Sequence, residues 1–178
     1  MGVEVIVLNG GSSSGKSTLA NSLQQRLKGT WLSLGVDDLI RAISFGPHDT
    51  GAGGSIDFGV DGSVIVGEKF RSAEKAWYEG LAAIARAGTG VIVDEVFLEG
   101  GRSQARLRTA LQGLAVLWVG VQCQPEVAEA RELRRADRTP GMARDQAQRV
   151  HEGVSYDLVV DTTANSPAKC AEAIAATI

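Results

Sequence analysis

The eight residues Gly-Gly-Ser-Ser-Ser-Gly-Lys-Ser, from Gly10 to Ser17, carry the clearest chemical signal in the chain. They fit the pattern G-x-x-x-x-G-K-[ST], in which the backbone N–H groups of a glycine-rich loop surround a phosphate group. Lys16 can reach the β- and γ-phosphates of a nucleotide, and the Ser17 hydroxyl can hold Mg²⁺. We expect the nucleotide contacts to come from Gly10, Gly11, Ser12, Ser13, Ser14, Gly15, Lys16, Ser17 and Thr18.

The segments on either side of this loop are those that a phosphate-binding loop needs. Residues 3–8 are short, apolar and rich in β-branched side chains, which is typical of a buried strand. Residues 16–27 place their leucines on one helical face. A helix that begins at the loop adds the partial positive charge of its N-terminus. A flexible Gly/Ser turn is the alternative, and the strand-loop-helix setting favours the phosphate site.

An acidic residue follows the apolar run from Val91 to Val93. Asp94 stands where a Walker-B carboxylate organises Mg²⁺ or the water of its shell. We therefore expect Ser17 and Asp94 to share one magnesium ion. A strand-end carboxylate exposed to solvent is the alternative for Asp94.

A second acidic residue, Asp37, follows Gly35 where a strand is expected to end and a helix to begin. Such a residue can be a helix N-cap, or it can face the ligand crevice of an open α/β sheet. The strand before Asp37 is expected to lie beside the phosphate loop, within reach of an acceptor hydroxyl. Asp38 is the rival for the same role, and position alone leaves both readings of Asp37 open.

Five arginines lie between residues 131 and 144, with acidic residues among them: Arg131, Arg134, Arg135, Arg138 and Arg144. A helix of mixed charge can be no more than a solvated face. Arg135 and Arg138 are three residues apart beside the helix break at residues 139–141. The guanidinium fork suits a triphosphate, so we expect these two arginines to close over it as a lid at about residues 131–144.

Five apolar strands alternate with helical patterns along the chain, at residues 3–8, 30–34, 91–97, 115–121 and 158–163. This order predicts an α/β fold with a five-stranded parallel sheet and helices on both faces. Ligands are expected at the carboxyl ends of the strands. The length of 178 residues predicts one domain, residues 1–178.

A glycine-rich insert at residues 46–66 interrupts this alternation. Residues 56–58 and 64–66 flank the turn signal Asp61-Gly62 and predict a small hairpin, with a loop as the alternative. The helical pattern of residues 67–87 then has core positions at Phe70, Ala73, Trp77, Leu81 and Ile84. Phe70 or Trp77 could instead wall a pocket for an aromatic ligand.

The composition excludes several classes of protein. A net charge of −3 gives no basic field for nucleic acid, and no apolar run is long enough to cross a bilayer. The expected first strand leaves no room for a signal peptide. Cys123 and Cys170 lack metal-ligand spacing and are expected to be small buried hydrophobes. We expect a cytoplasmic protein without nucleic-acid or membrane partners; whether it forms a homo-oligomer is open.

The chain resembles the chloramphenicol phosphotransferase family of P-loop kinases over nearly its whole length. Beyond the phosphate loop, the stretches that carry the resemblance are residues 6–9, 35–37, 94–98, 117–121, 137–138 and 150–154, with Trp77. The resemblance implies a P-loop NTPase fold similar to shikimate and adenylate kinases. It also implies transfer of the γ-phosphate of ATP, with Mg²⁺, to the 3-hydroxyl of chloramphenicol, and hence antibiotic resistance.

The same resemblance implies roles for individual residues. Asp37 would be the general base, Lys16 would stabilise the transition state, and Arg135 and Arg138 would be the lid arginines. The sequence departs from the family pattern at residues 44–55 and at Glu95, where a second Asp is expected. These departures bear on the identity of the acceptor more than on the type of reaction.

Two other functions stay open at this point. One is a housekeeping kinase for a small metabolite or nucleotide, of the shikimate or adenylate kinase type. The other is a nucleotide-binding sensor that transfers no phosphate. A kinase consumes ATP in proportion to an added hydroxyl compound, whereas a sensor binds nucleotide without needing an acceptor.

Overall fold

A computed structural model describes residues 2–43, 56–59, 63–134 and 141–178. Its main sheet is five-stranded and parallel, as predicted, and its strands follow the spatial order β2-β5-β1-β6-β7. The strands are β1 (Val5–Asn9), β2 (Trp31–Gly35), β5 (Gly90–Glu95), β6 (Val116–Gln122) and β7 (Leu158–Asp161). Because β1 is in the middle of the sheet, the loop that follows it emerges at the centre of the carboxyl edge.

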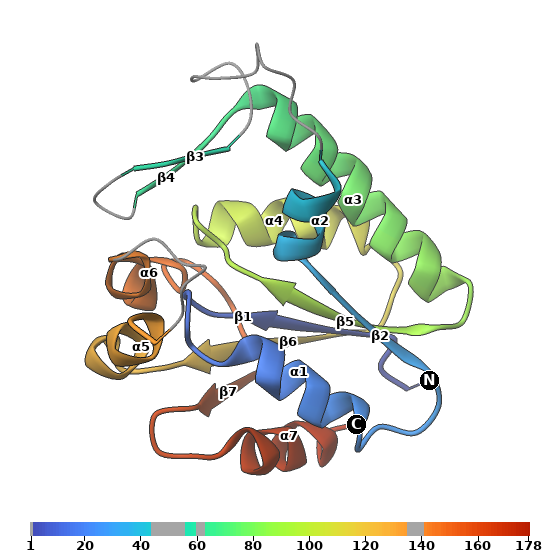
Figure 1. The fold of residues 1–178 in the computed structure, drawn as a ribbon. Helices are drawn as coiled ribbons and strands as arrows, with labels where there is room; N and C mark the ends of the chain where they lie inside the picture. Colours follow the sequence, from blue (N-terminus) through green and yellow to red (C-terminus); the bar gives the residue numbers. More distant parts are fainter. Residues whose placement is uncertain (1, 44–55, 60–62, 135–140) are drawn as a thin grey trace.

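Helices cover both faces of this sheet, so that the molecule has three layers (Figure 1). Within the described residues they are α1 (Lys16–Gln24), α2 (Val36–Ala42), α3 (Glu68–Arg86), α4 (Gly101–Ala110), α5 (Pro125–Glu132), α6 (Met142–Arg149) and α7 (Pro167–Ala175). In that part of the chain, none of the helices is long and apolar enough to span a bilayer.

The two faces of β1 supply the two halves of the core. Val5 and Val7 pack with α3 and α4, whereas Ile6 and Leu8 pack with α1 and α7. Successive side chains of a strand point to opposite faces, so one short apolar strand fills both layers. Every residue of β1 is buried, which explains why Val5 to Leu8 are all apolar and do not alternate with polar residues.

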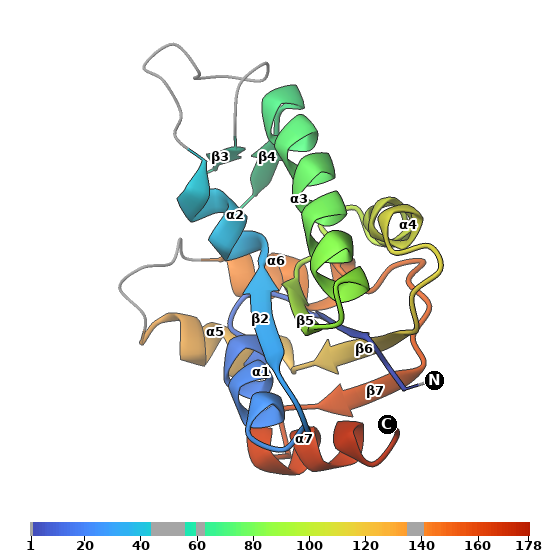
Figure 2. The ribbon, with the colours of Figure 1, turned by 90° about the vertical axis from the view of Figure 1, so that its right-hand side faces the viewer.

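The predicted hairpin is present as a separate two-stranded sheet. Strands β3 (Ile56–Phe58) and β4 (Val64–Val66) pair antiparallel, with Ile56 opposite Val66. The hairpin lies near α2 and one end of α3, away from α7 (Figure 2). The rest of the predicted insert, residues 46–55 and the predicted turn at residues 60–62, lies outside the described residues.

The buried face of α3 differs from the predicted one. Phe70 and Leu81 are buried as expected, but Trp77 is only partly buried, and Tyr78 occupies the core beside it. Adjacent positions on a helix point about 100° apart, so the helix is rotated relative to the predicted stripe. Neither Phe70 nor Trp77 lines the cavity at the phosphate loop.

The two cysteines agree with the prediction, whereas the ends of some helices and strands do not. Cys123 and Cys170 are buried and free, as predicted. Helix α5 ends at Glu132, earlier than the predicted end near residue 136, and β7 is shorter than its predicted range. Apolar patterning finds an element more reliably than it finds where the element stops.

Asn9, the last residue of β1, joins three segments that meet behind the phosphate loop. Its Oδ1 accepts a hydrogen bond from the Phe97 amide at 2.9 Å, and its Nδ2 donates to the Val150 carbonyl at 2.8 Å. Nδ2 also donates to the Tyr156 hydroxyl at 2.5 Å. The side chain is buried, so these partners are satisfied by protein and not by water.

Replacing Asn9 by Ala should destabilise the fold by about 2–4 kcal/mol, because two buried backbone groups lose their partner and a small cavity forms. Urea unfolding measures this loss. Asn165→Ala is the matched control, because the bond from Asn165 to the Asp161 carbonyl is exposed, and it should cost less than about 1 kcal/mol. Equal losses in the two variants would contradict the assigned role of Asn9.

Candidate active site

The phosphate loop adopts the irregular backbone that its pattern predicts. Ser13 has a φ of +57°, which is the left-handed region that residues other than glycine rarely adopt. Such conformations cluster at ligand sites, where surrounding structure holds them in place. The hydroxyl oxygens of Ser12, Ser13 and Ser14 are buried and have no hydrogen-bond partner among the described residues. Buried unpaired hydroxyls around a ring of amides fit a polar ligand such as phosphate.

Two segments outside the loop hold its backbone. The Ser12 amide donates a hydrogen bond to Oε1 of Gln146 at 2.9 Å, and the Thr162 hydroxyl donates to the Ser14 carbonyl at 2.6 Å. Gln146 belongs to α6 and Thr162 follows β7. Neither contact was predicted from the sequence, because neither residue belongs to a motif and both contacts depend on the strand order.

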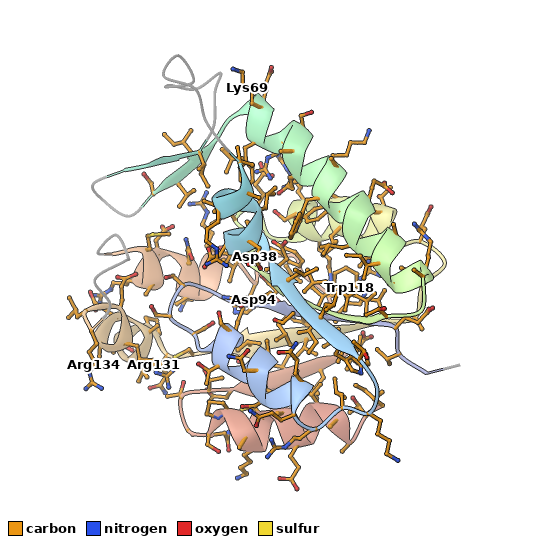
Figure 3. All side chains as sticks on the ribbon, turned by 45° about the vertical axis from the view of Figure 1, so that its right-hand side comes forward. Asp38, Lys69, Asp94, Trp118, Arg131 and Arg134 are labelled. Carbon is orange, nitrogen blue, oxygen red and sulfur yellow. The ribbon has the colours of Figure 1, made fainter. Side chains whose placement is uncertain are left out.

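Lys16, Ser17 and Asp94 come together at the carboxyl edge of the sheet. The Ser17 hydroxyl donates to Oδ2 of Asp94 at 2.7 Å, and Nζ of Lys16 lies 3.7 Å from Oδ1 of the same carboxylate. Lys16 Nζ also donates to the Gly11 carbonyl at 3.0 Å. Figure 3 shows Asp94 in the central part of the molecule, where these elements meet.

The donor set around Asp94 is suited to a metal ion that is shared with phosphate. Ser17 and Asp94 offer hard oxygen ligands, and Mg²⁺ typically takes one or two protein oxygens together with phosphates and water. In the described ranges there is no cluster of three or more His, Cys, Asp or Glu residues that could form a complete protein cage. The residues present therefore fit Mg²⁺ that is brought with a nucleotide.

A cavity of about 550 Å³ extends from the phosphate loop towards α2 and the hairpin. Ser12, Lys16 and Ser17 line it at one end. Much of the remaining wall is apolar and comes from α2, the hairpin and the segment after β5, with Val36, Ile40, Ile56, Val64, Val96 and Leu98. The cavity thus has room for a small molecule with an apolar body beside the phosphate site.

Asp37 and Asp38 both lie at the start of α2, but their side chains have different surroundings. The N-cap of α2 is Gly35, whose amide donates to Oδ2 of Asp38 at 2.8 Å. Asp38 also forms an ion pair with Arg41. The reading of Asp37 as an N-cap is therefore wrong, because Asp38 does the capping. Asp37 lines the cavity.

The strand that leads into α2 does not lie where the sequence predicts. The strand before Asp37 is not beside the phosphate-loop strand, because β5 lies between β2 and β1. The end of β2 nevertheless approaches the end of β5 very closely. A Cβ atom added to Gly35 would lie 2.4 Å from the carbonyl oxygen of Asp94. This contact brings α2, and with it Asp37, to the edge of the site.

The predicted lid arginines, Arg135 and Arg138, lie outside the described residues, but the two helices that flank them are tied together. Glu132 is buried at the end of α5, and its carboxylate accepts from the amides of Gly141 at 2.9 Å and Ala143 at 2.8 Å. This carboxylate serves the N-terminus of α6, where amide donors are otherwise unpaired.

Arg131 lies beside the phosphate loop, although the sequence did not single it out from its arginine neighbours. Its Nη2 donates to the Thr162 carbonyl at 2.8 Å, and its Nη1 is 3.8 Å from the point that a Cβ on Gly15 would occupy. Arg134, by contrast, is exposed. Both are labelled in Figure 3.

Glu95 follows Asp94 in the chain but belongs to a buried network on the opposite face of β5. Burial, together with the nearby carboxylates of Glu74 and Asp94, raises the pKa of Glu95 to about 8. Glu74 is itself buried on α3 and is held by Arg71 at 2.8 Å and Arg106 at 3.1 Å. The sequence missed this network because its charged members are spread over α3, α4 and β5.

His151 and Tyr156 form a second unpredicted group behind the loop. The Tyr156 hydroxyl lies 2.6 Å from Nδ1 of His151 and also contacts Asn9. Burial lowers the pKa of His151, and the positive charge of Lys16 lowers it further. Burial also raises the pKa of Tyr156 to about 12. The group is therefore neutral at physiological pH and supports the end of β1 without adding charge.

The raised pKa of Glu95 predicts a pH-dependent stability. Because the folded state holds this proton more tightly than the unfolded chain, the contribution of Glu95 is complete below its ordinary pKa of 4.5 and is lost as the pH rises through about 8. Glu95→Gln cannot ionise. Its stability relative to wild type should therefore increase between pH 5 and pH 8, by up to about 1.4 kcal/mol for each pH unit.

Urea unfolding at several pH values measures this difference. Glu79→Gln is the control, because Glu79 is exposed on the same helix as Glu74, and its curve should run parallel to that of the wild type. Parallel curves for Glu95→Gln as well would mean that folding does not raise the pKa of Glu95.

Known proteins resemble this chain in sequence and in structure. The profile of the chloramphenicol phosphotransferase-like protein family matches residues 3–178. A Mycobacterium tuberculosis (strain H37Rv) protein named as a candidate O-phosphotransferase is 33% identical over 176 residues, which cover 90% of this chain and 76% of that protein.

Two solved structures illustrate the likeness in fold. The Deinococcus radiodurans tunicamycin resistance protein has a TM-score of 0.65 at 21% identity, covering 97% of this chain and 94% of that one. The Mycobacterium tuberculosis APS kinase, solved with AMPPNP and APS, has a TM-score of 0.60 at 14% identity, with coverage of 97% and 94%. At these identities the likeness shows the fold alone, which is that of P-loop kinases.

The family match spans nearly the whole chain and agrees with the geometry at the phosphate loop. The chain therefore belongs to the chloramphenicol phosphotransferase-like family.

Proposed function

We propose that this protein transfers the γ-phosphate of ATP to a hydroxyl group of a small molecule. The observation that carries the proposal is the joining of Lys16, Ser17 and Asp94 at one end of a cavity that also contains Asp37. Phosphoryl transfer depends on positioning and on stabilisation of charge, and these residues are suited to both. Family membership supports the same class of reaction.

In the proposed reaction, the oxygen of the acceptor hydroxyl bonds to the γ-phosphorus, and Asp37 accepts the proton of that hydroxyl. The bond from the γ-phosphorus to its bridging oxygen breaks, and ADP leaves. Lys16 stabilises the charge on the phosphates, and Ser17 and Asp94 would hold Mg²⁺, which would neutralise further charge. Arg135 and Arg138 are proposed to close over the triphosphate, in keeping with the guanidinium preference for phosphate.

We further propose an antibiotic as the acceptor, with the 3-hydroxyl of chloramphenicol, or of a related compound, as the first to test. The apolar wall formed by residues such as Ile40, Ile56 and Val96 supports an acceptor with an apolar body. In this proposal the enzyme works in the cytoplasm and confers resistance. A metabolite kinase of the shikimate or adenylate kinase type and a nucleotide sensor are the outcomes that the experiment must separate from it.

The experiment is a screen of chloramphenicol, other hydroxylated antibiotics and small metabolic alcohols with ATP and Mg²⁺. The expected result is a mass gain of one phosphoryl group on chloramphenicol or a related antibiotic, abolished by excess chelator and in the folded variant Lys16→Ala. Phosphorylation of a metabolite alone would favour a housekeeping kinase. Tight ATP binding with no product from any compound would favour a sensor, and unchanged turnover in Lys16→Ala would overturn the kinase proposal.

The neighbouring acids at the start of α2 give a matched pair of variants. Asp37→Asn should lower kcat by roughly 10²–10⁴ with nucleotide affinity retained, because it removes the proposed base. Asp38→Asn should mainly destabilise α2, by about 1 kcal/mol, because it weakens the contact to Gly35 and the pair with Arg41. If Asp37→Asn had normal turnover per folded molecule, the base would have to be another group.

A further inference from the structure

Gln146 is an uncharged residue that joins α6 to the phosphate loop. Only 2% of its surface is exposed, and its Oε1 accepts a hydrogen bond from the Ser12 amide at 2.9 Å. The helix also packs directly on the loop, since a Cβ on Gly11 would lie 3.2 Å from Cβ of Gln146. Figure 1 shows α6 beside the connection between β1 and α1.

The bond to Ser12 fixes the orientation of the Gln146 amide. A backbone N–H can only donate, so the side-chain atom that faces Ser12 must be the oxygen. The Nε2 group, with two N–H donors, must therefore point elsewhere. Gln146 lines the cavity at the phosphate loop, and the hydrogen bond found for its side chain among the described residues is the one that Oε1 accepts.

Gln146 lies at the end of the loop where the γ-phosphate of a nucleotide belongs. Lys16, which reaches the β- and γ-phosphates in this motif, has its Nζ 3.0 Å from the Gly11 carbonyl. Gly11 is also the residue that packs against Gln146. The buried Ser12 hydroxyl in the same cavity wall has no partner among the described residues. A neutral donor group thus adjoins the lysine that handles the terminal phosphates.

We propose that Nε2 of Gln146 donates a hydrogen bond to the γ-phosphate of the bound nucleotide. The residue would then contact the group that is transferred, and its own orientation would be set by the phosphate loop. This inference rests on the proposed function, because it assumes a nucleoside triphosphate in the site. A hydrogen bond to a charged phosphate is among the stronger hydrogen bonds, so an amide donor at this position can contribute to nucleotide affinity.

The test compares nucleotides with and without a γ-phosphate. In Gln146→Glu the carboxylate can still accept from the Ser12 amide, but it can no longer donate to a phosphate. Calorimetric titration with AMPPNP and with ADP should show that affinity for AMPPNP falls roughly tenfold or more, relative to the change for ADP. Gln148→Glu, on the exposed face of the same helix, adds the same charge and should leave the ratio of affinities unchanged.

A second variant covers the case in which the buried Glu prevents folding. Gln146→Met keeps the approximate volume but neither accepts nor donates, and it too should lower the ratio of AMPPNP to ADP affinity, by a similar factor. Urea unfolding of each variant establishes that it is folded before binding is measured. A folded Gln146→Glu or Gln146→Met with an unchanged ratio would overturn the inference.

Two further outcomes distinguish a failure of this inference from a failure of the proposed function. If only the KM for the acceptor rose, Gln146 would contact the acceptor and not the nucleotide, which also overturns the inference while leaving the proposed function intact. If the wild-type protein bound neither AMPPNP nor ADP, the proposed function itself would fail, and this inference with it.

Discussion

The central position of β1 is the constraint on which the rest of the molecule depends. The strand pairs in parallel with β5 on one side and β6 on the other, and all of its residues are buried. Its carboxyl end therefore opens in the middle of the sheet edge, with ends of other strands on both sides. The phosphate loop begins there, Asp94 is one strand away in register with Leu8, and Gly35 is in register with Asp94.

Adjacent acids on β5 have opposite environments, which shows how a strand can serve two layers at once. Asp94 faces the cavity and contacts Ser17 and Lys16, whereas Glu95 is buried and its pKa is raised to about 8. Alternation along a strand explains the difference. A charged carboxylate would be costly at the position of Glu95, where Glu74 already takes up the nearby arginines. A single negative charge on β5 thus faces the nucleotide site.

The features that could be predicted from the sequence are those that depend on residues close together in the chain. The phosphate loop, the five strands and the hairpin are specified by residues close together in the chain, so pattern and spacing sufficed. The contact of Gln146 with Ser12 spans 134 residues and depends on where α6 packs. Tyr78 replaced Trp77 in the core because a one-residue shift turns a helix face by about 100°, which apolar spacing alone resolves poorly. The capping role of Asp38 required the actual start of α2.

The close packing of Gly35 against Asp94 has a consequence for how the size of the cavity can be changed. A methyl group at position 35 would collide with a backbone carbonyl and not with a flexible side chain, so this wall of the cavity has no slack. Enlarging the cavity by substitution must therefore take place at other lining positions, such as Ile56, Val64 and Met142, whose side chains can be shortened. Libraries that aim to enlarge the cavity should vary these positions and leave residue 35 unchanged.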